Sequence, residues 1–229
     1  MRPGPGSGPP ERPRAMPRRP ARSARRPPAG RTGPAAWLAA AREMLVADGV
    51  DQVRIDRIAR RMGVTRGGFY WHFRDRQQLL DALLHDWEES CMIPFAAMAA
   101  APLDLESGIL RLFSFWLEAS DFNLRFDAAV RDWARKSDPV RAAVRRADER
   151  RVAFIRGLFA GAGYGEPEAL VRARVLYYTQ VGYHTLEVEE TLAARTALAS
   201  LYYAVFTGRP LDPARIRLLP GPSPGPAFT

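Results

Sequence analysis

Apolar residues recur every three or four positions along most of residues 34–208, and this spacing predicts helices. The first predicted helix spans about 34–48, carries Trp37, Ala41 and Leu45 on one side, and ends at Gly49. Shorter helices are predicted at about 55–62 and 66–73. A long fourth helix begins at Asp75, whose carboxylate suits a helix start.

The second half of the chain continues the helical pattern. Pro94 is expected to kink or end the fourth helix. A fifth helix carries apolar residues between 105 and 116, and a sixth carries them between 126 and 133. Ser137-Asp138-Pro139 is a start signal for a seventh, because a capping side chain precedes a proline. Helices at about 166–188 and 191–206 complete a set of about nine. Since no strand-like alternation occurs, the predicted fold class is all-α.

Net charge is concentrated at one end of the chain. Residues 1–33 hold nine arginines and one acid, which gives +8 of the overall +9 and leaves +1 for the rest. This segment is rich in Pro, Gly and Arg, so we predict a disordered basic arm. Residues 209–229, with six prolines, form a predicted Pro-rich C-terminal tail. The charge of the folded body alone therefore does not predict a nucleic-acid binder.

Several functional classes are disfavoured by the sequence. The single cysteine, Cys91, excludes an internal disulfide, and no Cys/His cluster has the spacing of a metal site. No apolar run is long enough for a membrane span, and the first residues lack a secretory signal, so we expect a cytoplasmic protein with no membrane partner. No phosphate loop, nucleophile motif or paired metal ligands occur. We therefore expect no enzyme, no catalytic residues and no cofactor.

Residues 55–73 have the pattern of a helix-turn-helix. Ala59 is small enough for two helices to cross, Gly63 suits the turn, and Thr65 stands where the next helix begins. Spacing alone is also compatible with an ordinary helical hairpin. The run Phe69-Tyr70-Trp71-His72-Phe73 favours a DNA-binding motif, because five consecutive rings cannot all face a core.

Residues 37–84 resemble the DNA-binding head of the tetracycline-repressor (TetR) family of bacterial transcriptional regulators. The matching residues are Ala41, Leu45, Gly49, Ile58-Ala59, Gly63-Val64-Thr65, Phe69-Tyr70, His72-Phe73 and Leu79-Leu80. One position departs from the family pattern, since Arg54 replaces the usual hydroxyl residue before the second helix and cannot accept a capping hydrogen bond. The resemblance implies a helix-turn-helix DNA-binding domain at 34–84 and a helical ligand-binding and dimerisation domain at 85–208.

The resemblance also implies a set of DNA-binding residues. Arg66 is the candidate for reading a guanine, and the hydroxyls of Thr65 and Tyr70 suit phosphate contacts. Trp71 has two open interpretations, a base contact or a ring that braces the first helix. The full predicted set is Arg54, Thr65, Arg66, Gly67, Gly68, Tyr70, Trp71, His72, Arg74 and Arg76.

The second domain is expected to dimerise through helices 166–188 and 191–206 and to hold a small organic inducer. Ten residues, mostly aromatic, are candidates for the ligand pocket: Trp87, Cys91, Phe113, Trp116, Phe126, Trp133, Tyr177, Tyr178, Gln180 and His184. For each of them an ordinary core position is the alternative. The predicted function is a dimeric repressor that binds a palindromic double-stranded DNA operator and is released by its ligand. An activator, and a nonspecific architectural DNA-binding protein that uses the basic arm, remain open alternatives.

Overall fold

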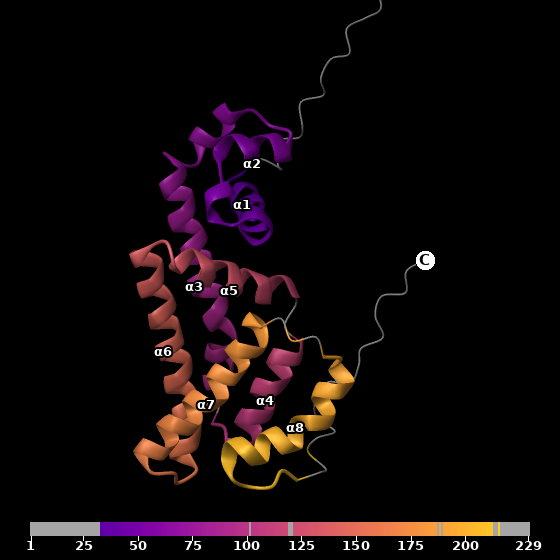
Figure 1. Ribbon diagram of the computed structural model, residues 1–229. Helices are drawn as coiled ribbons and strands as arrows, with labels where there is room; N and C mark the ends of the chain where they lie inside the picture. The colour runs from indigo at the N-terminus through magenta and orange to yellow at the C-terminus, as the bar shows by residue number, and fades with distance from the viewer. Residues whose placement is uncertain are drawn as a thin grey trace, which may run out of the picture.

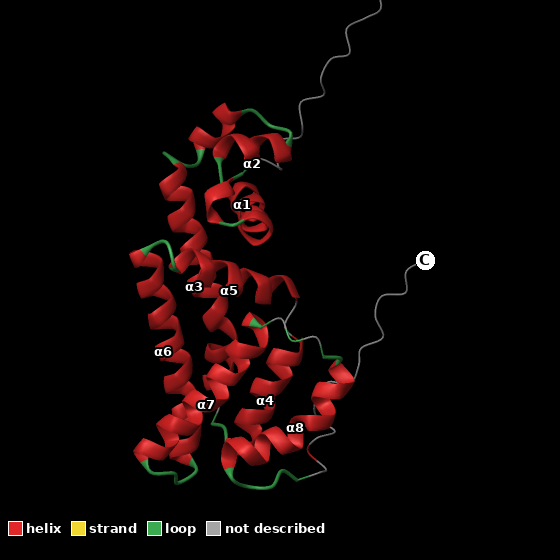
Figure 2. Ribbon diagram, in the orientation of Figure 1, coloured by secondary structure: helices red, strands yellow, loops and turns green. Residues whose placement is uncertain are grey.

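The computed structural model describes residues 33–100, 102–118, 121–186, 188, 190–212 and 215. Every regular element among them is helical (Figures 1 and 2), which confirms the all-α prediction. The basic arm and most of the C-terminal tail lie outside the described residues. The elements are α1 (Pro34–Asp48), η2 (Val50–Gln52), α2 (Ile55–Met62), η3 (Arg66–Trp71), α3 (Arg76–Ala99), α4 (Leu105–Glu118), α5 (Asp121–Ala134), α6 (Asp138–Gly161), α7 (Glu166–Thr185) and α8 (Leu192–Thr207), where η denotes a 3-10 helix.

The N-terminal head is built around buried aromatic rings. Phe69 is fully buried, meets Trp37 edge-on with ring centroids 5.3 Å apart, and stacks on Phe73 at 5.3 Å. Gly63 ends α2 with φ of 68°, the left-handed conformation that glycine adopts without strain. These contacts hold η3 across the start of α1. The helix-turn-helix packing predicted from Ala59, Gly63 and Phe69 is therefore present.

Helix ends follow the sequence signals with three exceptions. The Asp75 carboxylate accepts a hydrogen bond from the Gln78 amide, as predicted for the start of α3. Pro94, however, does not end that helix, which continues to Ala99. Ser137 and Thr65 precede α6 and η3 without a side-chain capping bond. The third predicted helix is a 3-10 helix, which agrees with the low α-helical propensity of consecutive Gly67 and Gly68.

The head and body share one core at their junction. Phe126, Val130 and Trp133 of α5 belong to the same buried cluster as Trp37 and the other head residues. A second cluster lies farther along the body, between α4, α6, α7 and α8. α3 runs from the head into the body (Figure 1) and passes through residue 84, where the sequence places a domain boundary. Helix α5 therefore packs directly against the head.

Candidate nucleic-acid interface and regulatory cavity

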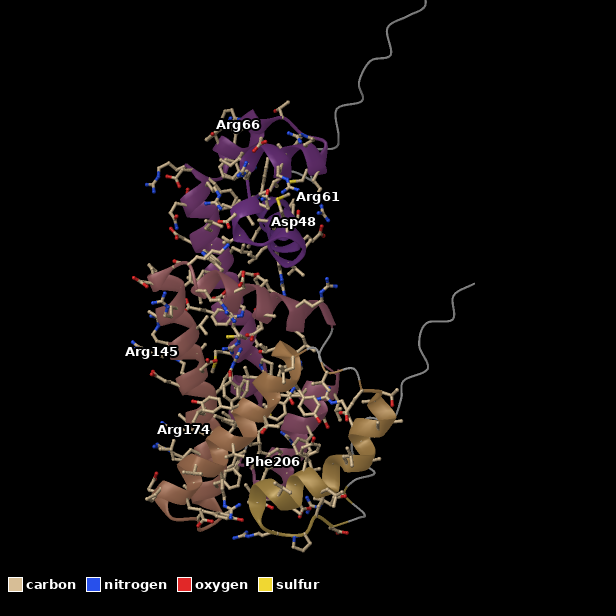
Figure 3. All side chains as sticks on the ribbon, in the orientation of Figure 1. Asp48, Arg61, Arg66, Arg145, Arg174 and Phe206 are labelled. Atoms are coloured by element: carbon tan, nitrogen blue, oxygen red, sulfur yellow. The ribbon has the colours of Figure 1, made fainter. Side chains whose placement is uncertain are left out.

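The 3-10 helix η3 presents an exposed polar and aromatic surface at the end of the head. Arg66 lies at the tip of the molecule farthest from α8 (Figure 3), and its guanidinium donates a 3.1 Å hydrogen bond to the Tyr70 hydroxyl. The Trp71 side chain is 86% exposed, so it does not brace the first helix. Thr65 and His72 are also exposed. The head thus brings these five predicted DNA-binding residues together on one short segment.

Gly67 and Gly68 have no structural requirement for glycine within the described fold. Neither has a positive φ. A Cβ at Gly67 would lie 3.8 Å from Thr65 Oγ1, and one at Gly68 would lie 4.0 Å from Trp37, both ordinary contact distances. Alanine would therefore fit at both positions without a clash.

The three flanking arginines occupy different environments. Arg74 is 83% exposed on its side chain and reaches only the neighbouring Asp75 at 3.0 Å. Arg54 is exposed and donates to the Asp51 carbonyl at 3.2 Å. Arg76 instead donates from Nε to the Val53 carbonyl and from Nη2 to the Val50 carbonyl, each at 2.6 Å. Its guanidinium is therefore engaged in holding the loop before α2, which does not favour the predicted phosphate contact.

Residues 38–83 match the family model described as bacterial regulatory proteins, tetR family. The chain carries a TetR-family DNA-binding domain. This segment is 51% identical over 45 residues to the HTH-type transcriptional regulator SrpR of Pseudomonas putida, covering 20% of this chain and 21% of that protein. It is 42% identical over 50 residues to the tetracycline repressor protein class A of Escherichia coli, covering 22% and 23%. The matched segment spans only about a fifth of these two relatives.

The TetR-like fold extends beyond the head. GusR of Salmonella enterica superposes with a TM-score of 0.62 at 16% identity, covering 81% of this chain and 98% of that one. The ketosteroid transcriptional regulator KstR2 of Mycobacterium tuberculosis gives 0.60 at 17% identity, covering 78% and 95%. At this identity the likeness shows the fold alone.

A cavity of about 170 Å³ lies between α3, α4, α5, α6 and α7. Seven of the ten predicted ligand residues line it: Trp87, Cys91, Trp116, Phe126, Tyr177, Gln180 and His184. The amide of Gln180 and the imidazole of His184, predicted to pair one turn apart, are in hydrogen-bond contact. The predicted residues thus gather mostly at one cavity, where they make up seven of its twenty lining residues.

The other three predicted ligand residues lie elsewhere. Phe113 lines a smaller hollow toward α8, which Trp116 and Gln180 also border. Trp133 is buried in the core shared with the head. Tyr178 is 55% exposed on the outer side of α7. The spacing of aromatic residues along a helix shows which of them share a face. It does not show which residues of different helices line the same cavity.

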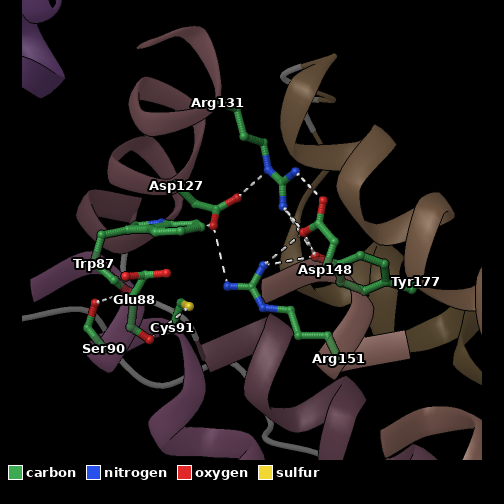
Figure 4. Close-up of polar contacts among 9 residues, drawn as sticks. All are labelled: Trp87, Glu88, Ser90, Cys91, Asp127, Arg131, Asp148, Arg151 and Tyr177. Atoms are coloured by element: carbon green, nitrogen blue, oxygen red, sulfur yellow. Dashed lines mark hydrogen bonds and ion pairs between the residues drawn. The ribbon is translucent and has the colours of Figure 1, made fainter. Parts of the chain in front are cut away.

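Three charged residues of the cavity wall, Asp127, Arg131 and Arg151, form a network with Asp148 (Figure 4), which the sequence did not predict. Arg131 donates to Asp127 at 2.7 Å and forms a bidentate pair with Asp148 at 2.7 and 2.9 Å. Arg151 donates to the Tyr177 hydroxyl at 2.8 Å and to Asp127 at 3.4 Å. The network joins α5, α6 and α7.

Two further contacts complete this network. The Tyr177 hydroxyl donates to Asp148 at 2.6 Å, and the Trp87 indole N–H of α3 donates to Asp127 at 3.1 Å. Burial favours the neutral form of Asp127, but the Arg131 and Arg151 guanidiniums outweigh it and lower the pKa of this carboxyl. Asp127 is therefore ionised at neutral pH. Asp127 and Arg131 are four residues apart, a spacing that is also typical of exposed ion pairs on a helix. Only the packing of the helices therefore shows that this pair is buried.

The remaining titratable groups of the cavity are neutral at pH 7. Burial raises the pKa of the Cys91 thiol, and it also raises the pKa of the Tyr177 phenol. Burial lowers the pKa of His184, and the Arg195 charge lowers it further. The fixed charges of the cavity are thus those of its arginines and the carboxylates paired with them.

Apolar side chains are exposed along α7 and α8. Val171 and Val175 lie on α7, and Leu201 and Val205 on α8 are 62% and 73% exposed. In each pair the two residues are four positions apart and share a helix face. Such a face is unfavourable in water unless another surface covers it. Helices α7 and α8 are the ones that the sequence predicts for dimerisation.

No helix in the described ranges has the length and apolar character of a membrane span. No group of three or more His, Cys, Asp or Glu residues there has the arrangement of a metal site.

Proposed function

We propose that this protein is a sequence-specific transcriptional regulator, which binds a palindromic DNA operator as a homodimer and is released by a small organic ligand. The observation that carries the proposal is the exposed surface of Arg66, Tyr70 and Trp71 on a TetR-family helix-turn-helix. The role is repression in the bacterial cytoplasm, without catalysis.

On DNA, η3 enters the major groove and Arg66 pairs with a guanine through its O6 and N7. The hydroxyl of Tyr70 holds Arg66 at 3.1 Å, which limits the orientations of the guanidinium before binding. Thr65, His72 and Arg74 contact phosphates, and Trp71 contacts a base edge. Gly67 and Gly68 let the backbone approach the DNA closely, which accounts for two glycines that the fold itself does not require.

Dimerisation covers the exposed apolar residues of α7 and α8 with the same helices of a second copy. A single η3 reads few base pairs, so useful specificity needs two half-sites related by a two-fold axis. The symmetry of the dimer then requires a palindromic operator.

Ligand release follows from the contacts between cavity and head. α3 and α5 both line the cavity, and α5 also packs on α1, where the Arg42 guanidinium lies 4.2 Å from the centre of the Phe126 ring. A ligand that favours a different position of α5 therefore biases the orientation of both heads. DNA and ligand then prefer different states of the dimer, which is the requirement for coupling.

The test is enrichment of binding sites from a random pool of duplex DNA at about 0.15 M salt, with the full chain and with a variant lacking residues 1–32. Both proteins should recover the same two-fold symmetric site. Enrichment of no sequence, with binding lost in the shorter chain, would favour the architectural alternative and would overturn the proposal.

A further inference from the structure

Arg151, one of the arginines that line the cavity, carries a buried hydrogen-bond donor without a partner among the described residues. Arg151 is only 8% exposed, and both of its terminal nitrogens are engaged, by Tyr177 and by Asp127. Its Nε is buried and has no hydrogen-bond acceptor among the described residues. Leaving a buried donor of a charged group unsatisfied is unfavourable, because the group has lost its hydrogen bonds to water. The hydrogen bonds of the Arg151 guanidinium are therefore complete only when an acceptor from a bound molecule reaches Nε.

This donor belongs to the cavity wall. Arg151 and Cys91 both line the cavity, and Cys91 lies beside the guanidinium (Figure 4). The Cys91 thiol donates to the Glu88 carbonyl of its own helix at 3.3 Å, so the thiol hydrogen already has an acceptor. Much of the rest of the wall is apolar, with Phe95, Phe115 and Val181 among its residues. The unsatisfied donor of Arg151 thus belongs to a residue of a cavity wall whose other members are largely apolar.

The arginines that line the cavity are each already paired with a carboxylate. Arg131 and Arg151 are matched by Asp127 and Asp148, and Arg42 forms an ion pair with Asp86 at 3.7 Å. The thiol and imidazole on the wall are neutral, as described above. A buried carboxylate would leave one negative charge uncompensated, and a cation would leave one positive charge, each at a large cost. Charge balance therefore selects a neutral acceptor.

Size sets a further limit on the ligand. A cavity of about 150 Å³ holds benzene, and this one is about 170 Å³. A single ring with a short substituent fills such a space. Its aromatic neighbours Trp87 and Trp116 suit an apolar ring of this kind.

We propose that the ligand is a small neutral carbonyl compound, whose oxygen accepts the Nε–H of Arg151 and whose apolar ring fills the cavity between α3, α5 and α7. The inference rests on the proposed function, in which this cavity holds the regulatory ligand. It goes further by assigning the ligand's charge, its single acceptor and the residue that recognises it.

The test compares four probes that share one skeleton and differ only in polarity: acetophenone, isopropylbenzene, benzoate and benzamidinium. Dissociation constants are measured by calorimetric titration of the full chain at pH 7. Acetophenone should bind about 10- to 100-fold more tightly than isopropylbenzene, which is the range for a hydrogen bond from a charged group. Benzoate and benzamidinium should bind no more tightly than isopropylbenzene.

The variant Arg151→Lys keeps the positive charge and removes the Nε–H. Its affinity for acetophenone should fall to that for isopropylbenzene, while the latter stays unchanged. Arg145→Lys is the matched control, because Arg145 lies on the same helix with its side chain 75% exposed. Thermal unfolding of both variants verifies that they fold, and if Arg151→Lys does not, the ranking of probes on the unaltered chain decides alone.

The results separate this inference from the proposed function. Equal binding of acetophenone and isopropylbenzene, tighter binding of benzoate, or no binding of any probe would each overturn the neutral-carbonyl site. Release of DNA by acetophenone is measured separately. If acetophenone binds as expected and the protein stays on DNA, the site stands and ligand-controlled release fails.

Discussion

Replacing Arg76 with alanine distinguishes a structural arginine from a DNA-binding one. The guanidinium makes two 2.6 Å hydrogen bonds to the carbonyls of Val50 and Val53, which fix the loop between α1 and α2. Hydrogen bonds to charged groups contribute about 1.5–3 kcal/mol each, and Arg76 is only half-buried. The expected loss of unfolding free energy is therefore about 2–4 kcal/mol.

Urea denaturation followed by circular dichroism measures this loss. With a slope of about 2–3 kcal/mol per molar urea, the unfolding midpoint of Arg76→Ala should fall by about 1 M. The head and body share one buried cluster, so the loss should appear in the main transition. Arg74→Ala is the matched control, because Arg74 is 83% exposed and its removal should change stability by less than about 0.5 kcal/mol.

DNA titrations over a range of salt concentrations give the second half of the result. Arg74→Ala should reduce the log–log salt slope by about 0.9, the value for one lost phosphate contact, and folded Arg76→Ala should keep the slope of the unaltered chain. The reasoning is refuted if Arg76→Ala unfolds at the same urea concentration as the unaltered chain and loses salt slope. Arg76 would then be a phosphate ligand.

Three further predictions concern the body. Tyr177→Phe removes the hydroxyl shared by Arg151 and Asp148, and should lower the unfolding free energy by about 1–3 kcal/mol in the same urea assay; an unchanged midpoint would mean that water replaces it. Leu201→Glu places a charge on the exposed face of α8, and sedimentation should then detect a monomer where the unaltered chain is a dimer. The folded-state pKa of Asp127 is lowered, so its contribution to stability is complete above about pH 4 and declines as the pH falls toward the folded-state pKa. In Asp127→Asn the unfolding free energy should therefore depend less on pH in this range. Equal slopes of unfolding free energy against pH for the two proteins would contradict this prediction.

The helices and the head follow from local signals in the sequence. Gly49, Gly63 and Asp75 mark ends that depend on backbone geometry and one hydrogen bond, and these act within a few residues. Of the two effects predicted for Pro94, a kink or an end, the end is not observed, since α3 packs in both core clusters and continues past it. Local preference is overridden where tertiary burial is large enough.

The cavity could be only partly predicted because it depends on how helices pack. Trp133 and Trp87 have similar sequence surroundings, yet only Trp87 reaches the cavity. The charges of Asp127 and Arg151 are separated by 24 residues and meet only when α5 and α6 pack together. No periodicity within one helix indicates such a contact. The charge network between the helices could therefore not be predicted from the sequence.

The most direct test of DNA reading by η3 is a base-substitution scan of the recovered operator with the unaltered chain and with Arg66→Ala. The account predicts that Arg66→Ala loses about 1–3 kcal/mol of affinity and loses discrimination at one base pair in each half-site, with discrimination elsewhere preserved. Uniform weakening across all sequences, or retention of every base preference, would contradict the assignment of Arg66 as the residue that reads the operator.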